Sequence, residues 1–352
     1  MRVLWASKGW HSTDRNVVEG LAARGHDVAL FTLAALRFDW TVPVLGTPTH
    51  PLLGPLLGPG QLRKACEEFR PDVVFGNFVT TYGNYAARGV PPGVPAVAVG
   101  WGSDLLLHGS WFGVSLLTRV ALRRSRLLLA NADHLAEAGR SLGARSVELL
   151  PYGIDTELFR PDYPVPAGWP EGSAPTLICT RNLQPLYDHK TLIRALAQCT
   201  HEPAPRLVIV GDGPERPQLE RLAETSGVAD RVIFTGRIDN KVLPAWLAQA
   251  DVWVSAAHSD GLPLSMLEAM ATDLKVVLAE LPITRDWHVP GVSWTFPVAS
   301  PEACACILDE ALAAPVLSDS PGRALVLEKG SLKATLDGFE AVVMRLREAS
   351  ES

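Results

Sequence analysis

The chain has 352 residues, of which 47% are hydrophobic and 20% are charged, and its formal net charge is −6. This composition indicates a globular protein long enough for two domains; it excludes a disordered chain and gives no overall argument for nucleic-acid binding. No apolar run approaches the ~20 residues of a membrane-spanning helix, and residues 1–6 read as a strand rather than as a signal peptide. The five cysteines show no metal-binding spacing, so we expect free thiols, a reducing compartment and a cytoplasmic protein.

The first half of the chain alternates predicted strands and helices. A helix is predicted over 16–24, where Gly25 ends the helical spacing. Repeated strand–helix units of this length are typical of a doubly wound parallel sheet. The predicted strands cover residues 3–6, 27–32, 71–75, 96–99 and 127–130.

Two segments of this half have unusual compositions. Residues 41–60 combine many Pro and Gly residues with Leu, which predicts an apolar loop with little regular structure and hints at an apolar acceptor. Residues 115–126 predict a basic amphipathic helix. Such a helix is usually a solvated face, but it is also a candidate for peripheral contact with an anionic membrane. Its basic residues are Arg119, Arg123, Arg124 and Arg126.

A second alternating series follows a Pro- and Gly-rich segment over 161–175, which is the best linker candidate. The chain therefore predicts two similar α/β halves with a cleft between them. Ligands of such sheets bind beyond the carboxyl ends of the strands, so the loops after Cys179, Val210, Thr235 and Ser255 are expected to face that cleft. The predicted strands are 176–179, 207–210, 232–234, 251–255 and 275–278, and the predicted helices are 189–199, 215–226 and 241–249.

The stretch over 257–280 carries an acidic residue in an apolar helix. Pro263 occupies the predicted helix start, and Glu268 is the charged residue within the helix. A carboxylate there needs a partner, because burying it unpaired is costly. The amides at the helix start form a ready anion site. Two interpretations remain open: a sugar-nucleotide site, or a surface helix whose Glu pairs with an Arg.

Candidate cations lie upstream of this helix. Arg181 directly follows a predicted strand, where its guanidinium suits a diphosphate, and Lys190 begins the next helix. Surface ion pairs are the alternative for both, and a tight turn explains Gly211-Asp-Gly213 equally well. No Asp-x-Asp pair and no His-x-x-x-His spacing occurs, so no metal site is expected. Arg, Lys and helix amides would then stabilise the charge of a leaving diphosphate.

Several motifs, in order along the chain, resemble those of one known family. They are Arg24-Gly-His-Asp-Val28, Leu149-Leu-Pro-Tyr-Gly-Ile-Asp155, Phe159-Arg-Pro161, Val210-Gly-Asp-Gly-Pro214, Phe234-Thr-Gly-Arg237, Ala250-Asp-Val252 and Ser259-Asp-Gly-Leu-Pro263 running into Leu267-Glu-Ala-Met270. Over nearly its whole length the chain resembles the retaining nucleotide-sugar glycosyltransferases of family 4 (glycosyl transferases group 1), which have the GT-B fold. The resemblance implies two doubly wound Rossmann-like domains facing across a cleft: an acceptor domain over 1–158, a donor domain over 159–332, and a C-terminal helix over 333–352 that packs back on the first.

The resemblance also implies roles for residues of the second half. Glu268 would hold the ribose hydroxyls, and Asp260 would face the hydroxyls of the donor sugar. Arg181 would neutralise the leaving diphosphate. Lys190 is a further catalytic candidate, and whether it substitutes for the Lys expected shortly after Arg181 stays open. The backbone of the helix start would contact sugar and phosphate through Gly261, Leu262, Pro263, Leu264 and Ser265. The base would be framed by Gly236, Arg237 and Ile238, and Tyr187 is a further donor-binding residue.

In the first half, the resemblance assigns Gly9 and Trp10 to the donor phosphates and Trp101 and Asp104 to the sugar pocket. Four positions depart from the family pattern. Asp260 replaces the usual Glu, Tyr187 stands where a Lys is expected, Trp101 stands where many members have His, and Gly9 is the single glycine of a loop that commonly has two. All four departures surround the donor sugar and its phosphates, which indicates an unusual donor or a weakened enzyme.

These features predict a retaining, metal-independent glycosyltransferase without a cofactor, which moves a hexosyl group from a UDP- or GDP-sugar to a hydroxyl acceptor in glycan, glycolipid or secondary-metabolite synthesis. The resemblance implies that the leaving phosphate itself takes the acceptor proton. The alternatives are a sugar-nucleotide epimerase of the same fold and a non-catalytic sugar-nucleotide binding subunit. The expected partners are the donor and the acceptor, not nucleic acid, with the inner membrane face as a candidate for peripheral contact. The residues leave the base, the sugar, the acceptor and the oligomeric state open.

Overall fold

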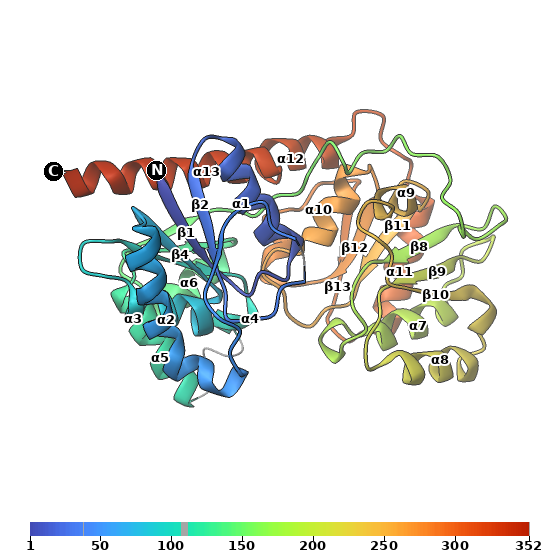
Figure 1. Cartoon of the computed structure of the whole chain (residues 1–352). Coiled ribbons are helices and arrows are strands. Elements are labelled where there is room, and N and C mark those ends of the chain that lie inside the picture. Colours follow the sequence, from blue (N-terminus) through green and yellow to red (C-terminus); the bar gives the residue numbers. More distant parts are fainter. Residues whose placement is uncertain (38, 107–111, 352) are drawn as a thin grey trace. The chain divides into compact units, whose positions relative to one another are not determined.

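The computed structural model describes residues 1–37, 39–106 and 112–351, which divide into two compact units (Figure 1). Unit 1 contains Met1–Tyr152 together with the residues from Leu332 onward, and unit 2 is Gly153–Ser331. Each unit has its own parallel sheet with helices packed against it, so the predicted pair of doubly wound α/β folds is confirmed. All five cysteines are free thiols, as expected.

The described strands of unit 1 form a parallel sheet in the order β3-β2-β1-β4-β5-β6-β7. The strands are short apolar runs, and β4 to β6 are buried throughout, because helices cover both faces of a parallel sheet. The strand order reverses between β1 and β4, which places the loops after these two strands at the topological switch point. The strands are β1 Arg2–Ala6, β2 Asp27–Phe31, β3 Val44–Leu45, β4 Val73–Asn77, β5 Ala96–Gly100, β6 Leu127–Ala130 and β7 Val147–Leu149.

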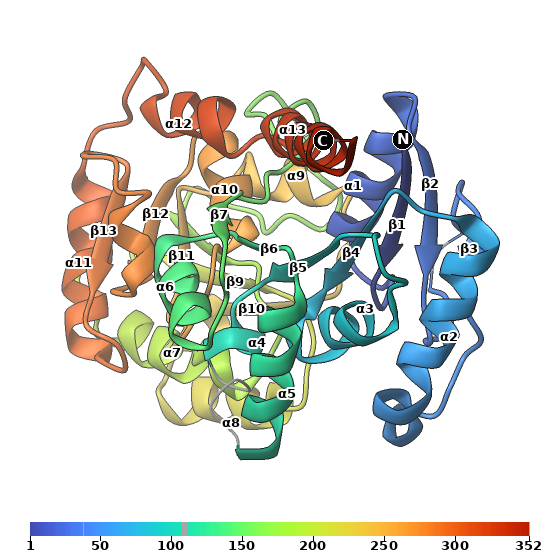
Figure 2. The same cartoon turned by 90° about the vertical axis from the view of Figure 1, so that its left-hand side faces the viewer.

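The helices of unit 1 include one from the far end of the sequence. Figure 2 shows this helix, α13, beside α1 on one side of the sheet, with α3 and α5 on the other. Phe339 of α13 packs edge-on against Trp5 and Phe75, with ring centroids 5.3 and 5.4 Å apart, so α13 completes the core of unit 1. The helical segments are α1 Ser12–Ala23, η1 Pro51–Leu53, α2 Gly54–Phe69, the π-helical η2 Phe78–Gly83, α3 Asn84–Gly89, α4 Ser103–Leu106, α5 Phe112–Arg124, α6 Asp133–Ser141 and α13 Leu332–Glu351.

The predicted apolar loop over 41–60 is wrong for its second half, because η1 and the first two turns of α2 occupy it. Pro59 lies inside α2 and has no N–H for the carbonyl of Pro55. The Arg88 side chain donates to that carbonyl instead, at 3.2 Å. Gly58 lies against the ring of Tyr85, where a Cβ would come within 2.8 Å. Residues that usually interrupt helices are therefore accommodated by tertiary contacts.

The described strands of unit 2 form a parallel sheet in the order β10-β9-β8-β11-β12-β13, which reverses between β8 and β11. Helices α7 and α8 pack together, and α10 contacts α9 and α12 (Figure 1). The strands are β8 Thr176–Cys179, β9 Arg206–Val210, β10 Val232–Gly236, β11 Val252–Ser255, β12 Lys275–Ala279 and β13 Ser293–Phe296. The helical segments are η4 Pro185–Tyr187, α7 His189–Gln198, α8 Arg216–Thr225, η5 Ala229–Arg231, α9 Leu243–Leu247, α10 Leu264–Ala271, η6 Pro282–Arg285, α11 Pro301–Ala313 and α12 Pro321–Lys329.

The segment predicted as a linker, 161–175, lies within unit 2, where Trp169 packs edge-on against Trp246 at 5.5 Å. The chain passes between the units at Tyr152/Gly153 and again at Ser331/Leu332. These two passages adjoin, because a Cβ on Gly153 would lie 2.2 Å from the carbonyl of Ser331. In the described part of the chain, no helix combines the length and apolar character needed to cross a bilayer.

Candidate functional site

The topological switch point of unit 2 brings four predicted site residues together. Arg181 follows β8 and forms an ion pair with Asp260, which lies in the loop after the neighbouring strand β11. The same guanidinium donates to the hydroxyl of Ser265 at 3.1 Å and lies 4.1 Å from the ring centroid of Tyr187. The side chains of Arg181 and Asp260 are only 11% and 19% exposed. The result is a mostly buried cluster with a cation at its centre.

This cluster explains two of the departures noted in the sequence. Tyr187 packs its ring over the guanidinium of Arg181, so the position where a Lys was expected orients a cation instead of supplying one. Asp260 compensates the charge of Arg181 directly. A diphosphate bound here would therefore have to share Arg181 with the carboxylate.

Glu268 lies one turn further along α10 than Ser265, so their side chains share one side of the helix. Burial raises the pKa of the Glu268 carboxyl to about 7, although the nearby charge of Arg181 lowers it in part. Among the described residues, no donor forms a hydrogen bond to this carboxylate. Among the described residues Glu268 therefore has no Arg partner, in contrast to the ion-paired surface helix that the sequence left open. Its carboxylate oxygens can accept hydrogen bonds from a ligand.

The start of α10 supplies fewer amide donors than the sequence suggested. Pro263 precedes the helix and has no N–H, and the amide of Gly261 already donates to Asp260 Oδ1 at 2.9 Å. The N–H groups of Leu262, Leu264 and Ser265 find no acceptor within the described residues. These three groups are the ones that an anion could use.

Lys190 forms a separate ion pair. Its Nζ lies 2.8 Å from Oε1 of Glu215, whose side chain is 8% exposed. An ion pair of this kind is the alternative that the sequence offered for Lys190. Among the described residues, Lys190 does not interact with the Arg181 cluster. Its role toward a diphosphate stays a prediction.

The glycines beside the cluster serve backbone packing. Gly211 has φ of +142°, and a Cβ there would lie 2.7 Å from the carbonyl oxygen of Arg181. A Cβ on Gly213 would lie 2.3 Å from the carbonyl oxygen of Leu183. The Gly-x-Gly turn therefore lets the loop carrying Arg181 lie directly on the loop after β9, which explains the motif without a ligand.

The residues predicted to frame the base lie at the end of β10. Gly236, with φ of +72°, accepts a hydrogen bond from the amide of Gly211 at 2.8 Å, which joins the loops after β9 and β10. Arg237 is exposed and Ile238 is half-buried. Their contact with a base stays a prediction.

In unit 1 a chain of hydrogen bonds from residues beside the switch point holds Trp101. The indole N–H of Trp101 donates to Asn77 Oδ1 at 3.2 Å, and the amide of Asn77 donates to Asp14 Oδ1 at 2.5 Å. The Trp101 ring stacks on Tyr152, with centroids 4.1 Å apart. Burial raises the pKa of the Asp14 carboxyl, while donors that include Trp5 oppose this rise. Trp101 is thus positioned by Asn77 of β4, which Asp14 of α1 holds in turn, and by the ring of Tyr152.

Asp104 is fully buried under the loop that carries Trp101. Its carboxylate accepts hydrogen bonds from the backbone amides of Val79, Trp101 and Gly102 at 2.8, 3.0 and 2.9 Å. Desolvation raises the pKa of this carboxyl, and the amide donors work against that rise. Asp104 therefore holds the loop in place, and its predicted contact with a sugar stays a prediction.

Gly9 and Trp10 form the turn after β1. Gly9 has φ of +66°, which favours glycine, and its amide donates to the hydroxyl of Ser7 at 2.9 Å. The indole N–H of Trp10 donates to the carbonyl of Ala35 at 2.8 Å. The amide of Gly9 is therefore occupied by its own loop rather than open to a phosphate.

Sequence reasoning missed three side chains that organise these sites. Ser265 was expected to contribute its backbone, whereas its hydroxyl binds Arg181. Asn77 and Asp14 were not singled out, although they hold Trp101. A polar residue that ends a fully buried strand, as Asn77 does, was the available signal.

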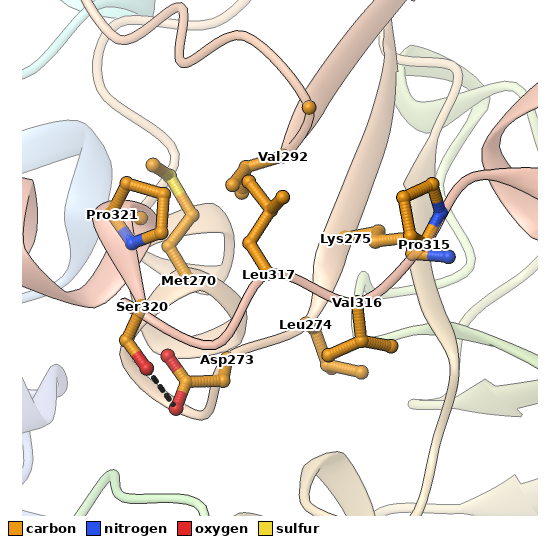
Figure 3. A pocket seen from close by; sticks show the side chains of 12 residues that line it. Met270, Asp273, Leu274, Lys275, Val292, Pro315, Val316, Leu317, Ser320 and Pro321 are labelled. Carbon is orange, nitrogen blue, oxygen red and sulfur yellow. Dashed lines mark hydrogen bonds between the residues drawn. The ribbon is translucent and has the colours of Figure 1, made fainter.

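Figure 3 shows a pocket at the opposite end of α10, lined mainly by apolar side chains such as Met270 and Leu317. Ser320 donates to Asp273 at 3.0 Å, and Lys275 donates to the carbonyls of Ala311 and Ala314. None of the described residues that line this pocket belongs to the Arg181 cluster, and the lysine that lines it, Lys275, is bonded to backbone carbonyls. Among the described residues, no group of His, Cys, Asp and Glu side chains has a metal-binding arrangement.

Comparisons with known proteins match both units. The family model described as "Glycosyl transferases group 1" matches residues 174–313, and the model described as "Glycosyl transferase 4-like domain" matches residues 9–153. The first lies within unit 2, and the second covers unit 1 from residue 9 to the boundary between the units at Tyr152/Gly153. Among the described strands, the two models together cover all of those in unit 2 and all of those in unit 1 except β1.

Two similar curated relatives are GDP-mannose-dependent alpha-(1-6)-phosphatidylinositol monomannoside mannosyltransferases. The one from Mycobacterium tuberculosis is 38% identical over 149 residues, which are 38% of this chain and 38% of the relative. The one from Mycolicibacterium smegmatis is 35% identical over 193 residues, 48% of this chain and 50% of the relative. The matched stretch thus spans half or less of these relatives' length.

Among solved structures, the sucrose-phosphate synthase from Thermosynechococcus elongatus superposes with a TM-score of 0.83 at 19% identity, over 99% of this chain and 100% of that one. At this identity the likeness shows the fold alone. The expected GT-B fold is confirmed.

Proposed function

Because this chain belongs to the family 4 glycosyl transferases (glycosyl transferases group 1), we propose that it transfers a hexosyl group from a nucleoside-diphosphate sugar to a hydroxyl acceptor. The observation that carries the proposal is the buried cluster of Arg181, Asp260 and Ser265 at the switch point of unit 2. A ligand of such a sheet binds at this edge. GDP-mannose is the first donor to test, since it is the donor named for both mycobacterial relatives.

In the proposed site, Arg181 and the free amides at the start of α10 stabilise the negative charge that develops on the leaving diphosphate. Preorganised donors of this kind contribute about 3 kcal/mol each to the transition state. Glu268 accepts hydrogen bonds from the ribose hydroxyls, and Asp260 faces the donor sugar once a ligand shares Arg181. The sequence has no Asp-x-Asp pair, which supports a metal-independent reaction. We propose retention of the anomeric configuration, with the leaving phosphate as proton acceptor.

The proposed acceptor is a hydroxyl group in a glycan, a glycolipid or a secondary metabolite. Leucines around the start of α2 support an amphipathic acceptor, because Leu52 and Leu56 are 84% and 74% exposed and Leu53 and Leu57 are exposed as well. An apolar surface of this kind suits a lipid-linked substrate. The basic side chains of α5, together with Arg126, are the part of the chain that we propose for peripheral membrane contact.

The test is release of GDP from GDP-mannose with and without a lipid-linked mannoside acceptor, in buffer containing EDTA. We expect release that depends on the acceptor. Release without acceptor, or isomerised donor, would favour an epimerase, and binding without release would favour a non-catalytic subunit. If GDP-mannose gives no release, UDP-sugars are the next donors.

Two variants test the assigned roles in the same assay. Glu268→Ala is expected to raise the donor KM about tenfold or more, since hydrogen bonds to a charged group contribute about 1.5–3 kcal/mol. Arg181→Ala is expected to lower kcat about 100-fold. Glu224→Ala and Arg221→Ala are matched controls, because both side chains are exposed on α8. Unchanged donor kinetics in Glu268→Ala would contradict the ribose assignment.

A further inference from the structure

His258 joins two loops of unit 2, one after β8 and one after β11. Its backbone amide donates to the carbonyl of Leu186 at 2.9 Å, and its Nε2 lies 3.0 Å from Oδ2 of Asp188. Because an ionised carboxylate can only accept, Nε2 is the donor in the second contact. Leu186 and Asp188 are the two neighbours of Tyr187 in the sequence, whereas His258 lies two residues before Asp260. His258 therefore holds both sides of Tyr187 from the loop that supplies Asp260.

The turn that follows Tyr187 depends on such support. Asp188 has φ of +42°, in the left-handed region that residues with a Cβ rarely adopt. Here the chain passes from η4 into α7, and the Asp188 carboxylate accepts from the amide and the hydroxyl of Thr191 at 3.4 and 2.6 Å. Among the described residues, the imidazole of His258 is the one donor to this carboxylate from outside α7. Without it, the turn would be held from its own helix alone.

Tyr187 and Asp260 set the orientation of one guanidinium. The ring centroid of Tyr187 lies 4.1 Å from Cζ of Arg181, and Asp260 accepts from Nη2 of the same side chain. Nη1 donates to the hydroxyl of Ser265 at 3.1 Å. The remaining nitrogen, Nε, is buried and has no acceptor within the described part of the chain. A shift of either loop would therefore turn Arg181 and change which of its N–H groups meets a ligand.

We propose that His258 is a positioning residue: it connects Tyr187 to the loop of Asp260 and so fixes Arg181 in the orientation that a leaving diphosphate needs. This step rests on the proposed function, because a preorganised cation accelerates a reaction only where negative charge develops. The side chains of His258 and Asp188 are 46% and 13% exposed, and a partly exposed ion pair contributes little to stability. The effect of His258 is therefore expected on catalysis rather than on the free energy of unfolding.

The test is steady-state kinetics of acceptor-dependent transfer. His258→Leu is expected to lower kcat about tenfold, which is part of the roughly 100-fold loss expected for Arg181→Ala, and to change the donor KM less than about twofold. In the Arg181→Ala background the same substitution is expected to lower kcat by less than about twofold, because the group that His258 positions is gone.

Three further variants separate positioning from a general effect of the substitution. His258→Gln keeps an amide N–H near the place of Nε2 and is expected to stay within about threefold of the wild-type kcat. His258→Asn is too short to reach Asp188 and should match His258→Leu. His288→Leu is the matched control, because this exposed imidazole of unit 2 also has a hydrogen-bond partner, the Ser293 hydroxyl at 3.0 Å. It should leave kcat within about twofold of the wild type.

A wild-type kcat in His258→Leu would overturn the proposal, and so would an equal loss in His288→Leu or an undiminished loss in the Arg181→Ala background. Hydrogen–deuterium exchange tests the contact between the loops independently of activity. We expect faster exchange over 185–191 and 256–261 in His258→Leu, and wild-type exchange in His258→Gln. If the wild type transfers no sugar, the proposed function fails, while faster exchange still supports the contact. Unchanged exchange would overturn the contact even in an active enzyme.

Discussion

In the candidate site, the protonation of the Glu268 carboxyl is the most informative to measure. Burial raises its pKa to about 7, and no described donor stabilises its ionised form. Ribose hydroxyls that donate to the carboxylate would favour ionisation and lower this pKa. Nucleotide binding should then release a proton, and the affinity should rise with pH up to about 7 and level off above it, because only the ionised form accepts both hydrogen bonds.

This linkage is measured by calorimetric titration with GDP at pH 6.5 in two buffers of different ionisation enthalpy. We expect the wild type to release up to one proton per GDP bound, and Glu268→Gln to release less. The exposed control Glu224→Gln should match the wild type. Equal release by the wild type and Glu268→Gln would place the titrating group elsewhere.

At the scale of single residues, the sequence was informative where a residue type was unusual for its predicted surroundings. Glu268 stood out because a lone carboxylate in an apolar helix needs a partner, and the described residues supply none. Asp14 gave no such signal, since an acid in the first turn of a helix is ordinary. Its burial against Asn77 and Trp5 arises only when distant strands meet.

Helix α2 shows how tertiary contacts decide where an element begins. Gly58 packs on Tyr85, whereas a Cβ added to Gly60 in the same helix would have no neighbour within 4 Å. Gly58→Ala is expected to destabilise the protein by about 1–3 kcal/mol through overpacking. Gly60→Ala is expected to stabilise it by about 0.5–1 kcal/mol, because alanine loses less backbone entropy in a helix.

The free energy of unfolding from urea denaturation, followed by circular dichroism, tests this pair of substitutions. Each serves as the control for the other, since the chemical change and the helix are the same. Destabilisation by both substitutions to the same extent would contradict the assigned packing of Gly58.

Most strands were predictable because a parallel sheet covered on both faces requires continuous apolar runs, such as 127–130 and 207–210. The missed strands β3, β7 and β13 are short or only partly buried, so their pattern is weak. The start of α2 was missed for a different reason. Its Pro and Gly residues have low intrinsic helix propensity, and the compensating contacts from Arg88 and Tyr85 come from residues that follow in the sequence.

At the scale of the whole molecule, the core of unit 1 depends on residues that follow unit 2 in sequence. Phe339 of α13 contacts Trp5, Phe75 and Tyr152. Phe339→Ala is expected to cost about 3–5 kcal/mol. We expect faster hydrogen–deuterium exchange in β1 and β4, and unchanged exchange in β8 and β11, because the loss falls within unit 1.

Met344→Ala is the matched control, since Met344 is 46% exposed on the same helix. It should leave exchange in both sheets unchanged. Faster exchange in β8 and β11 of Phe339→Ala would show that the two units do not unfold independently.

The assignment of α13 to unit 1 also has a consequence for biosynthesis. Ribosomes make residues 1–152 first, yet their aromatic core lacks Phe339 until the whole of unit 2 has been synthesised. Domains of a nascent chain usually fold in order from the N-terminus. Here the order should reverse: unit 2, which is continuous in sequence, can fold first, while the earlier-made sheet waits with its apolar face incomplete and exposed to chaperones.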